Sequence, residues 1–183
     1  QFHLLRLQSE EMRRMASLDI LTGVYNRRYL VERANQILAD ERNHPAWVVV
    51  LDLDHFKTVN DQHGHATGDR VLQAIGALFR GAFRERDVIA RSGGEEFVLL
   101  LGRRSGDELL AELERLRQRI EQLSPEGLPI TASIGAASHL GHAVAGFEGI
   151  FESADRAMYR AKELGRNRVV LAGTWTRRSH TAA

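Results

Sequence analysis

The sequence predicts an α+β domain with a β-α-β-β-α-β core, the ferredoxin-like arrangement, in which helices flank a central antiparallel sheet. Three observations carry this prediction. A continuous apolar run of strand length spans residues 47–53, and two further apolar runs flank a Gly-Gly pair within residues 87–101. Segments with helical periodicity separate these runs from each other and from a later strand. The core order places its helices on one face of the sheet.

The N-terminal residues 1–18 are predicted to form a linker or stalk helix with charged faces. Leu5 and Met12 lie seven positions apart, as do Gln8 and Met15, which is the spacing of a coiled coil. Two repeats are too few to separate a dimerising stalk from a plain connecting helix, so both readings stay open.

The remaining elements follow in an order that defines one domain over residues 19–172. They are a turn-rich segment at 19–28, a helix at 27–40, a buried strand at 47–53, a turn at 54–61, a helix at about 68–83, a hairpin at 87–101, an amphipathic helix at 109–123, a strand at 129–138, a helix at 147–164 and a short strand at 168–171. Residues 173–183 read as a flexible tail.

Composition excludes several classes of protein. The 183 residues suit a single core with a short appendage, and the formal net charge of +1 argues against general nucleic-acid binding. The absence of cysteine excludes disulfides and thiolate metal sites. No apolar run reaches the roughly 20 residues of a membrane span. We therefore expect a cytoplasmic domain without membrane contact, tethered to the inner membrane only if a region outside this chain supplies an anchor.

Two glycines and two acids lie together at the tip of the predicted hairpin. Gly93 and Gly94 accept positive φ and let a polyanionic ligand approach the backbone closely. Glu95 and Glu96 should diverge, because successive strand side chains point to opposite faces. One acid would then face a metal and the other a reacting group. A solvated turn with surface acids is the reading that the Gly-Gly pair alone favours.

The first strand ends in Asp52, which we expect to face Glu95 across neighbouring strands. Asp52, the Leu53 carbonyl and Glu95 are hard oxygen ligands. Such ligands suit Mg²⁺, which takes one or two carboxylates and completes its octahedron with substrate phosphates.

Polar residues downstream of this strand suggest contacts with a nucleotide. Backbone N–H groups of the turn at 54–61, together with Lys57, are suited to a triphosphate. Asn60 and Asp69 complement the polar edge of guanine, although turn formation and helix capping are the reading that these two residues alone favour.

A basic helix end lies near the C-terminus of the domain, where Lys162 and Arg166 flank Gly165. Helix capping accounts for the glycine and part of the charge, and phosphate binding is the alternative.

Taken together, these motifs resemble the GGDEF family of diguanylate cyclases in its Gly-Gly-Glu-Glu-Phe form. The resemblance covers about residues 19–171 and rests on blocks in the family order: Asp19-x-Leu-Thr-Gly-x-x-Asn-Arg-Arg28, Asp52-Leu-Asp-His-Phe-Lys-x-x-Asn-Asp61 with Gly64-His65 and Gly68-Asp69, Arg91-Ser-Gly-Gly-Glu-Glu-Phe97, Ser133-Ile-Gly135, and Ala154-Asp-x-Ala-Met-Tyr-x-Ala-Lys-x-x-Gly-Arg-Asn167. Ser92 and Ala66 depart from frequent family residues without touching the expected chemistry.

The resemblance implies a core like that of nucleotide cyclases and polymerase palms. It also implies the family's activity, which makes cyclic di-GMP from two GTP molecules with Mg²⁺, or Mn²⁺ in its place. By the resemblance, the metal ligands are Asp52, Leu53 and Glu95. Substrate contacts fall to His55, Phe56, Lys57, Asn60, Asp69, Gly93, Gly94, Lys162 and Arg166. Glu96 is the expected base for the attacking 3′-hydroxyl.

The resemblance also implies a homodimer and a separate inhibitory site. Each 3′-oxygen attacks the α-phosphorus of the other nucleotide, so two domains must face each other. Arg84-x-x-Asp87 matches the family's product-inhibition motif, with Arg115 completing the site, and lies roughly 20 Å from the hairpin tip. A helix-end salt bridge is the alternative reading of this motif.

Two other functions remain open at this point. One is a GTP or cyclic di-GMP receptor without turnover, against which the intact hairpin tip, Asp52 and Lys57 argue. The other is a different nucleotidyl transfer or cyclisation on a similar fold. Asn60 and Asp69 favour guanine over adenine as the base, and analysis of the product would decide between the two.

Overall fold

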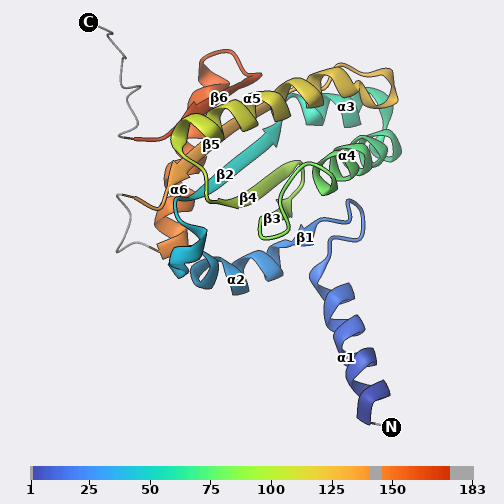
Figure 1. Ribbon diagram of the computed structural model, residues 1–183. Coiled ribbons are helices and arrows are strands. Elements are labelled where there is room, and N and C mark those ends of the chain that lie inside the picture. Colours follow the sequence, from blue (N-terminus) through green and yellow to red (C-terminus); the bar gives the residue numbers. More distant parts are fainter. Residues whose placement is uncertain (1, 141–145, 174–183) are drawn as a thin grey trace, which may run out of the picture.

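A six-stranded sheet with the strand order β1-β3-β4-β2-β5-β6 forms the centre of the molecule (Figure 1). The computed structural model describes residues 2–140 and 146–173. The four central strands pair antiparallel, whereas the edge strands β1 and β6 run parallel to β3 and β5. The strands are β1 (Tyr25–Asn26), β2 (Ala46–Leu53), β3 (Val88–Gly93), β4 (Glu96–Gly102), β5 (Ala132–Ser138) and β6 (Arg168–Leu171).

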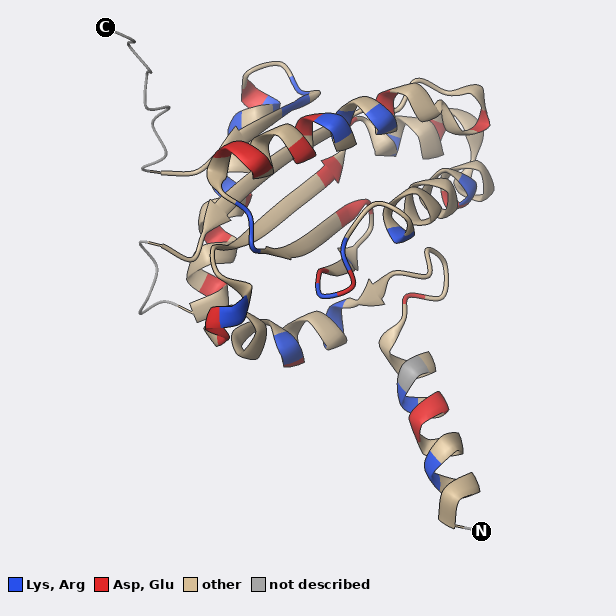
Figure 2. Cartoon of the chain, in the orientation of Figure 1, with Lys and Arg blue, Asp and Glu red and all other residues tan. Residues whose placement is uncertain are grey.

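Helices cover both faces of this sheet. They are α1 (Phe2–Ser17), α2 (Arg27–Ala39), α3 (Phe56–His63), α4 (His65–Arg80), α5 (Gly106–Leu123) and α6 (Gly146–Glu163), with short 3₁₀ turns η1 (Glu41–Asn43) and η2 (Pro125–Gly127). Basic and acidic residues are interspersed along the helices in the view of Figure 2, in keeping with the small net charge.

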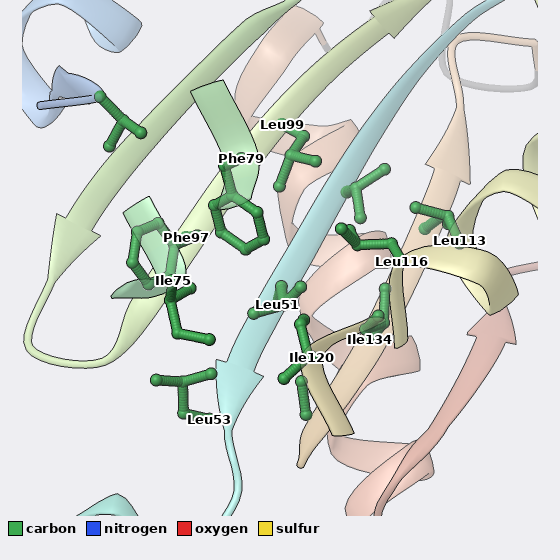
Figure 3. Close-up of a cluster of buried hydrophobic side chains, with 14 of the residues drawn as sticks. Leu51, Leu53, Ile75, Phe79, Phe97, Leu99, Leu113, Leu116, Ile120 and Ile134 are labelled. Carbon is green, nitrogen blue, oxygen red and sulfur yellow. The ribbon is translucent and has the colours of Figure 1, made fainter. Parts of the chain in front are cut away.

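The alternation of β2 divides the core into two apolar clusters. Val49, Leu51 and Leu53 point to the face that α4 and α5 cover, whereas Val48 and Val50 point to the face that α2 and α6 cover. Figure 3 shows side chains of the first cluster, including Leu51, Leu53, Ile75, Phe79, Phe97, Leu99, Leu113, Leu116, Ile120 and Ile134. Burial on both faces explains why β2 is an unbroken apolar run.

The predicted fold class is confirmed, and the structure adds to it. The core helices α4 and α5 lie on one face of an antiparallel centre, as the β-α-β-β-α-β order requires. The opposite face is covered by α2 and α6, which lie outside that core in sequence. The expected turn at 54–61 is wrong, because α3 forms there. Gly64, at φ 85°, separates α3 from α4, which therefore begins before the expected position.

The N-terminal helix α1 projects away from the rest of the described chain (Figure 1). Its apolar residues Phe2, Leu5, Met12 and Met15 are all at least 60% exposed, so burial within this chain does not stabilise it. Among the described residues no helix is both long and apolar enough to cross a bilayer. Of the predicted tail, residues 174–183 lie outside the described residues, and the proposed domain limits stay a prediction.

Candidate active site

The hairpin between β3 and β4 brings two acids to the end of β2. Gly94 at its tip has φ 49°, in the region that favours glycine, and the register shifts between Arg91 and Gly93. The Arg91 guanidinium donates to the Gly94 carbonyl at 2.8 Å and lies 3.4 Å from the Asp19 carboxylate. The first sequence block therefore braces the hairpin, a role that spacing along the chain did not indicate.

The register places Glu96, rather than Glu95, directly opposite Asp52. The expectation that Asp52 faces Glu95 is therefore wrong by one residue, because β4 begins only at Glu96 and Glu95 belongs to the turn. The Leu53 N–H donates to the Glu95 carbonyl at 3.3 Å, so Glu95 still lies beside the end of β2. Both acids therefore border the end of this strand.

Asp52 is an acid with little compensation for its charge. Its side chain is 13% exposed, and its ion-pair partner among the described residues is Lys162, whose Nζ lies 3.2 Å from Oδ1. Burial raises the pKa of Asp52 to about 6; the Lys162 charge opposes this shift, and the negative charges of Glu95 and Glu96 add to it. A bound cation would relieve this crowding of carboxylates.

The donor set fits a hard divalent cation that shares its coordination with a substrate. Within residues 2–140 and 146–173, no three His, Cys, Asp or Glu side chains converge as a metal-binding group. Asp52 and the Leu53 carbonyl lie at the end of β2, and Glu95 lies beside this end, close enough for its charge to act on Asp52. Two carboxylates and a carbonyl leave room for phosphate oxygens and water, which is the pattern that Mg²⁺ prefers.

Glu96 lies on the α2/α6 face and is held by a residue that the sequence analysis set aside. The Ser92 hydroxyl donates to the Glu96 carboxylate at 2.6 Å. Both residues line a hollow of about 300 Å³ whose walls include Leu30, Val31 and Phe151. A hydrogen bond therefore orients the Glu96 carboxylate, which borders open space. Ser92 lies four positions before Glu96, but only the bulged hairpin brings the two together.

The start of α3 presents backbone donors near the end of β2. His55 has φ 55° and begins the helix without a side-chain cap, which leaves the first N–H groups available for an anion. Phe56 is buried beneath this turn, and Lys57 is exposed beside it. The expected phosphate contacts therefore come from a helix N-terminus rather than from a simple turn.

The two residues expected to read guanine lie at the junction of α3 and α4. A Cβ atom on Gly68 would collide with the Asn60 side-chain carbonyl, so glycine is needed for the observed Asn60 position. Asp69 follows Gly68 directly and is exposed. No hydrogen bond that the structure gives for this junction uses either polar side chain as a helix cap.

The basic end of α6 packs against the end of β2. Lys162 pairs with Asp52, and the backbone N–H of Asn167 donates to Asp54 at 3.1 Å. Arg166, which precedes Asn167, is exposed with φ 65°. Asp54 is 5% exposed and also accepts hydrogen bonds from the hydroxyls of Thr131 and Ser133. Asp54 therefore positions the turn that carries Arg166, a role not foreseen from the Asp-x-Asp pattern.

The expected inhibitory residues lie at the other end of the sheet, in two neighbouring hollows. Arg84 and Asp87 share one turn, in which the Arg84 N–H donates to the Asp87 carboxylate at 2.9 Å. Arg84 lines a hollow of about 200 Å³, and Arg115 lines another of about 190 Å³. Arg104, which the sequence analysis did not single out, is buried beside Asp87.

The chain resembles known proteins over most of its length. A sequence profile of the family described as "Diguanylate cyclase, GGDEF domain" matches residues 16–168. The diguanylate cyclase DgcP of Pseudomonas aeruginosa is 43% identical over 171 residues, which are 89% of this chain and 25% of that protein. The diguanylate cyclase DosC of Escherichia coli is 38% identical over 176 residues, which are 92% of this chain and 38% of that protein.

A solved structure agrees with these sequence matches. The crystal structure of the coiled coil and GGDEF domain of DgcB from Caulobacter crescentus, in complex with c-di-GMP, superposes with a TM-score of 0.82 at 30% identity and covers 93% of each chain. This chain thus spans well under half the length of the two curated relatives but nearly the whole of that solved chain.

Proposed function

The chain belongs to the GGDEF family of diguanylate cyclases, and on that premise we propose that it condenses two GTP molecules into cyclic di-GMP and two pyrophosphates. The observation that carries the proposal is the crowding of Asp52, Glu95 and Glu96 at one strand end, next to Lys162 and the open N-terminus of α3. This combination suits a metal-bound nucleoside triphosphate. We also propose that the domain acts in the cytoplasm.

Each residue has a role that its surroundings support. Asp52, Glu95 and the Leu53 carbonyl would hold Mg²⁺, or Mn²⁺ in its place, which polarises the α-phosphate and the attacking hydroxyl. Lys57, Lys162 and Arg166 neutralise the phosphates, with the N–H groups at His55 and Phe56. Asn60 and Asp69 read the guanine edge. Gly93 and Gly94 leave the hairpin tip open, since no atom lies within 4 Å of a Cβ added at either.

Glu96 is the proposed acceptor for the 3′-hydroxyl proton. Ser92 fixes its carboxylate, and the adjoining hollow gives a second nucleotide access to it. As the 3′-oxygen bonds to the α-phosphorus of the facing nucleotide, the bond from that phosphorus to the pyrophosphate oxygen breaks. With a cation held at Asp52, Lys162 would be free to neutralise the phosphates.

Two copies of the chain are required by the product's symmetry. One domain holds one GTP, so each copy supplies the nucleophile for the other across a two-fold axis. The exposed apolar side chains of α1 are available to bring two copies together. We further propose that the product inhibits the enzyme at the surface formed by the Arg84–Asp87 turn and Arg115, since a relative of the same fold is known in complex with c-di-GMP.

The test is incubation with GTP and Mg²⁺, followed by chromatographic identification of the products. We expect cyclic di-GMP and pyrophosphate from the native chain and neither from Glu95→Ala. A native protein that binds GTP yet releases no cyclic dinucleotide, even when fused to a dimeric coiled coil, would instead identify a receptor module. A different cyclic product would identify another nucleotidyl transfer.

A further inference from the structure

The Asp87 carboxylate is fully engaged within the fold. The Arg104 guanidinium donates to both of its oxygens, at 2.8 and 2.7 Å. The backbone N–H groups of Arg84 and Gly102 donate to the same carboxylate at 2.9 and 3.4 Å. A carboxylate has about four lone-pair sites, so these four donors fill it. The side chains of Asp87 and Arg104 are 3% and 1% exposed.

Arg104 is itself locked on its other side. Its Nε atom contacts the Glu112 carboxylate of α5, and its Nη2 atom donates to the other Glu112 oxygen at 3.0 Å. Its Nη1 atom donates to the Gly102 carbonyl at 2.7 Å. Burial by itself would lower the pKa of Arg104, but the hydrogen bonds and charges of Asp87 and Glu112 raise it. Arg104 therefore stays charged and joins the Arg84–Asp87 turn to α5.

The neighbouring arginines Arg84, Arg103 and Arg115, unlike Arg104, are exposed and have few partners within the fold. Within the part of the chain that the structure describes, their side chains make one hydrogen bond, from Arg84 to the Arg103 carbonyl at 3.4 Å. Figure 2 shows the connection between β4 and α5, which holds Arg103 and Arg104, as a basic segment. These exposed guanidinium groups can bind phosphates or the O6 and N7 acceptors of guanine.

A guanine base has two distinct edges for such a site. Its O6 and N7 atoms accept hydrogen bonds from arginine, whereas its N1–H and 2-amino groups donate to a carboxylate. Asp87 could accept the second pair only if Arg104 left it. That would break the buried Arg104–Asp87 pair and leave Glu112 as the remaining carboxylate partner of Arg104.

Resting on the proposed product inhibition, we propose that Asp87 is a structural residue in this chain, and that the product binds through the exposed arginines without a contact from Asp87 to guanine. Arg104 prevents a contact between Asp87 and guanine, because it occupies the carboxylate acceptors that the base would use. The site recognises the phosphodiester and the O6/N7 edge of cyclic di-GMP and does not read the 2-amino group through Asp87.

The test compares cyclic di-GMP with its bis-inosine analogue, in which hydrogen replaces each 2-amino group. Calorimetric titrations use the native chain and Glu85→Gln, which removes the exposed carboxylate of the same turn. Loss of binding in Arg84→Ala assigns the signal to this site. We expect the two dissociation constants to agree within about threefold in Glu85→Gln, because no carboxylate then reads the amino group.

Two results would overturn the proposal. One is analogue binding that is tenfold or more weaker in Glu85→Gln, which would require Asp87 as the acceptor. The other is no binding of either dinucleotide at millimolar concentration, which would exclude an arginine site altogether. Turnover of GTP, measured separately on the same protein, shows whether the proposed cyclase activity fails independently of this site.

A second comparison uses Arg104→Gln with Arg103→Gln as the matched control. Freeing Asp87 should introduce discrimination of about tenfold or more against the inosine analogue, and Arg103→Gln should introduce none. A folded Arg104→Gln protein that binds both dinucleotides equally would show that Arg104 does not withhold Asp87. If Arg104→Gln does not fold, the comparison in Glu85→Gln still decides the question.

Discussion

Asp52 and Asp87 are both mostly buried acids, at opposite ends of the central strands, but their surroundings differ sharply. Asp87 receives four N–H donors, two of them from Arg104, which is almost fully buried. Asp52 has one lysine partner at 3.2 Å, and two neighbouring acids add to the burial that raises its pKa to about 6. Asp87 is satisfied by the fold, whereas Asp52 still lacks part of its electrostatic compensation.

The contrast separates acids that hold a fold together from acids that await a ligand. A buried acid whose acceptors are filled contributes to stability, and removing its partner leaves a stranded charge. A buried acid with unmet acceptors costs stability in the free protein, and that cost is typical of functional sites. Residue type and motif membership do not distinguish the two cases, since both acids belong to family motifs.

The largest expected effect is the loss of stability when the Asp87 pair is broken. Arg104→Gln should lower the free energy of unfolding by about 3–5 kcal/mol, because it leaves the buried Asp87 and the partly exposed Glu112 without their partner. Urea denaturation measures this change. Arg103→Gln, at the exposed neighbour, should change the same quantity by no more than about 0.5 kcal/mol. Equal effects in the two variants would show that Arg104 is not structurally engaged.

Removing the charge at Asp52 should abolish most of the activity. Asp52→Asn keeps the shape of the side chain but loses an anionic oxygen donor, so we expect kcat for GTP to fall by about 10²–10³-fold. Release of pyrophosphate from GTP and Mg²⁺ measures this. Asp107→Asn, an exposed acid in the first turn of α5, is the matched control. Retained turnover in Asp52→Asn would remove this acid from the site.

The same variant should stabilise the metal-free protein, the opposite of the change at Arg104. Folding raises the pKa of Asp52 from 3.8 to about 6, so the folded state favours the protonated acid. Its contribution to stability is full below about pH 4 and is lost as pH rises through 6. Asp52→Asn does not titrate, so above pH 6 it should be more stable than the native chain by about 1–2 kcal/mol.

Denaturation with a chelator at pH 4 and pH 7.5 tests this sign. The advantage of the variant should shrink toward zero at the lower pH. A variant that is less stable than the native chain at pH 7.5 would show that the charge of Asp52, like that of Asp87, is compensated by the fold, and would contradict the contrast between the two acids.

The residues of the candidate site could be predicted from the sequence better than the contacts that hold them in place. The glycines and acids of the hairpin, Asp52 and the basic end of α6 follow short-range patterns, and the fold brings them to one end of β2. The pairing of Asp52 with Glu96 was not predicted, because a change of one residue in the length of the turn decides which of the two acids is the first residue of β4. Local spacing does not encode the register across a bulged hairpin.

The supporting contacts are long-range and were therefore missed. Arg104 meets Asp87 and Glu112 only after β3, β4 and α5 have packed together, and Asp54 meets Asn167 across 113 positions. The second helical layer, α2 and α6, was likewise not implied by the core order. In each case the partner is distant in sequence, and no periodicity points to it.

The smallest predicted effect concerns Glu96, which lies between the two extremes with one hydroxyl donor. Ser92→Ala should lower kcat by about tenfold or less, because a hydrogen bond to a charged group is lost, and should leave KM for GTP nearly unchanged. Ser92→Thr keeps the hydroxyl and should retain most of the activity. A change confined to KM would indicate that Ser92 contacts the substrate rather than positioning Glu96.

The central claim is that two copies of this chain, each holding one GTP, form the product together. Its most direct test is the specific activity for cyclic di-GMP formation measured over a wide range of protein concentration, with saturating GTP and Mg²⁺. We expect a specific activity that rises with protein concentration and then reaches a plateau as dimers saturate. Cyclic di-GMP formed at a specific activity that stays constant down to concentrations at which the chain is monomeric by light scattering would contradict it.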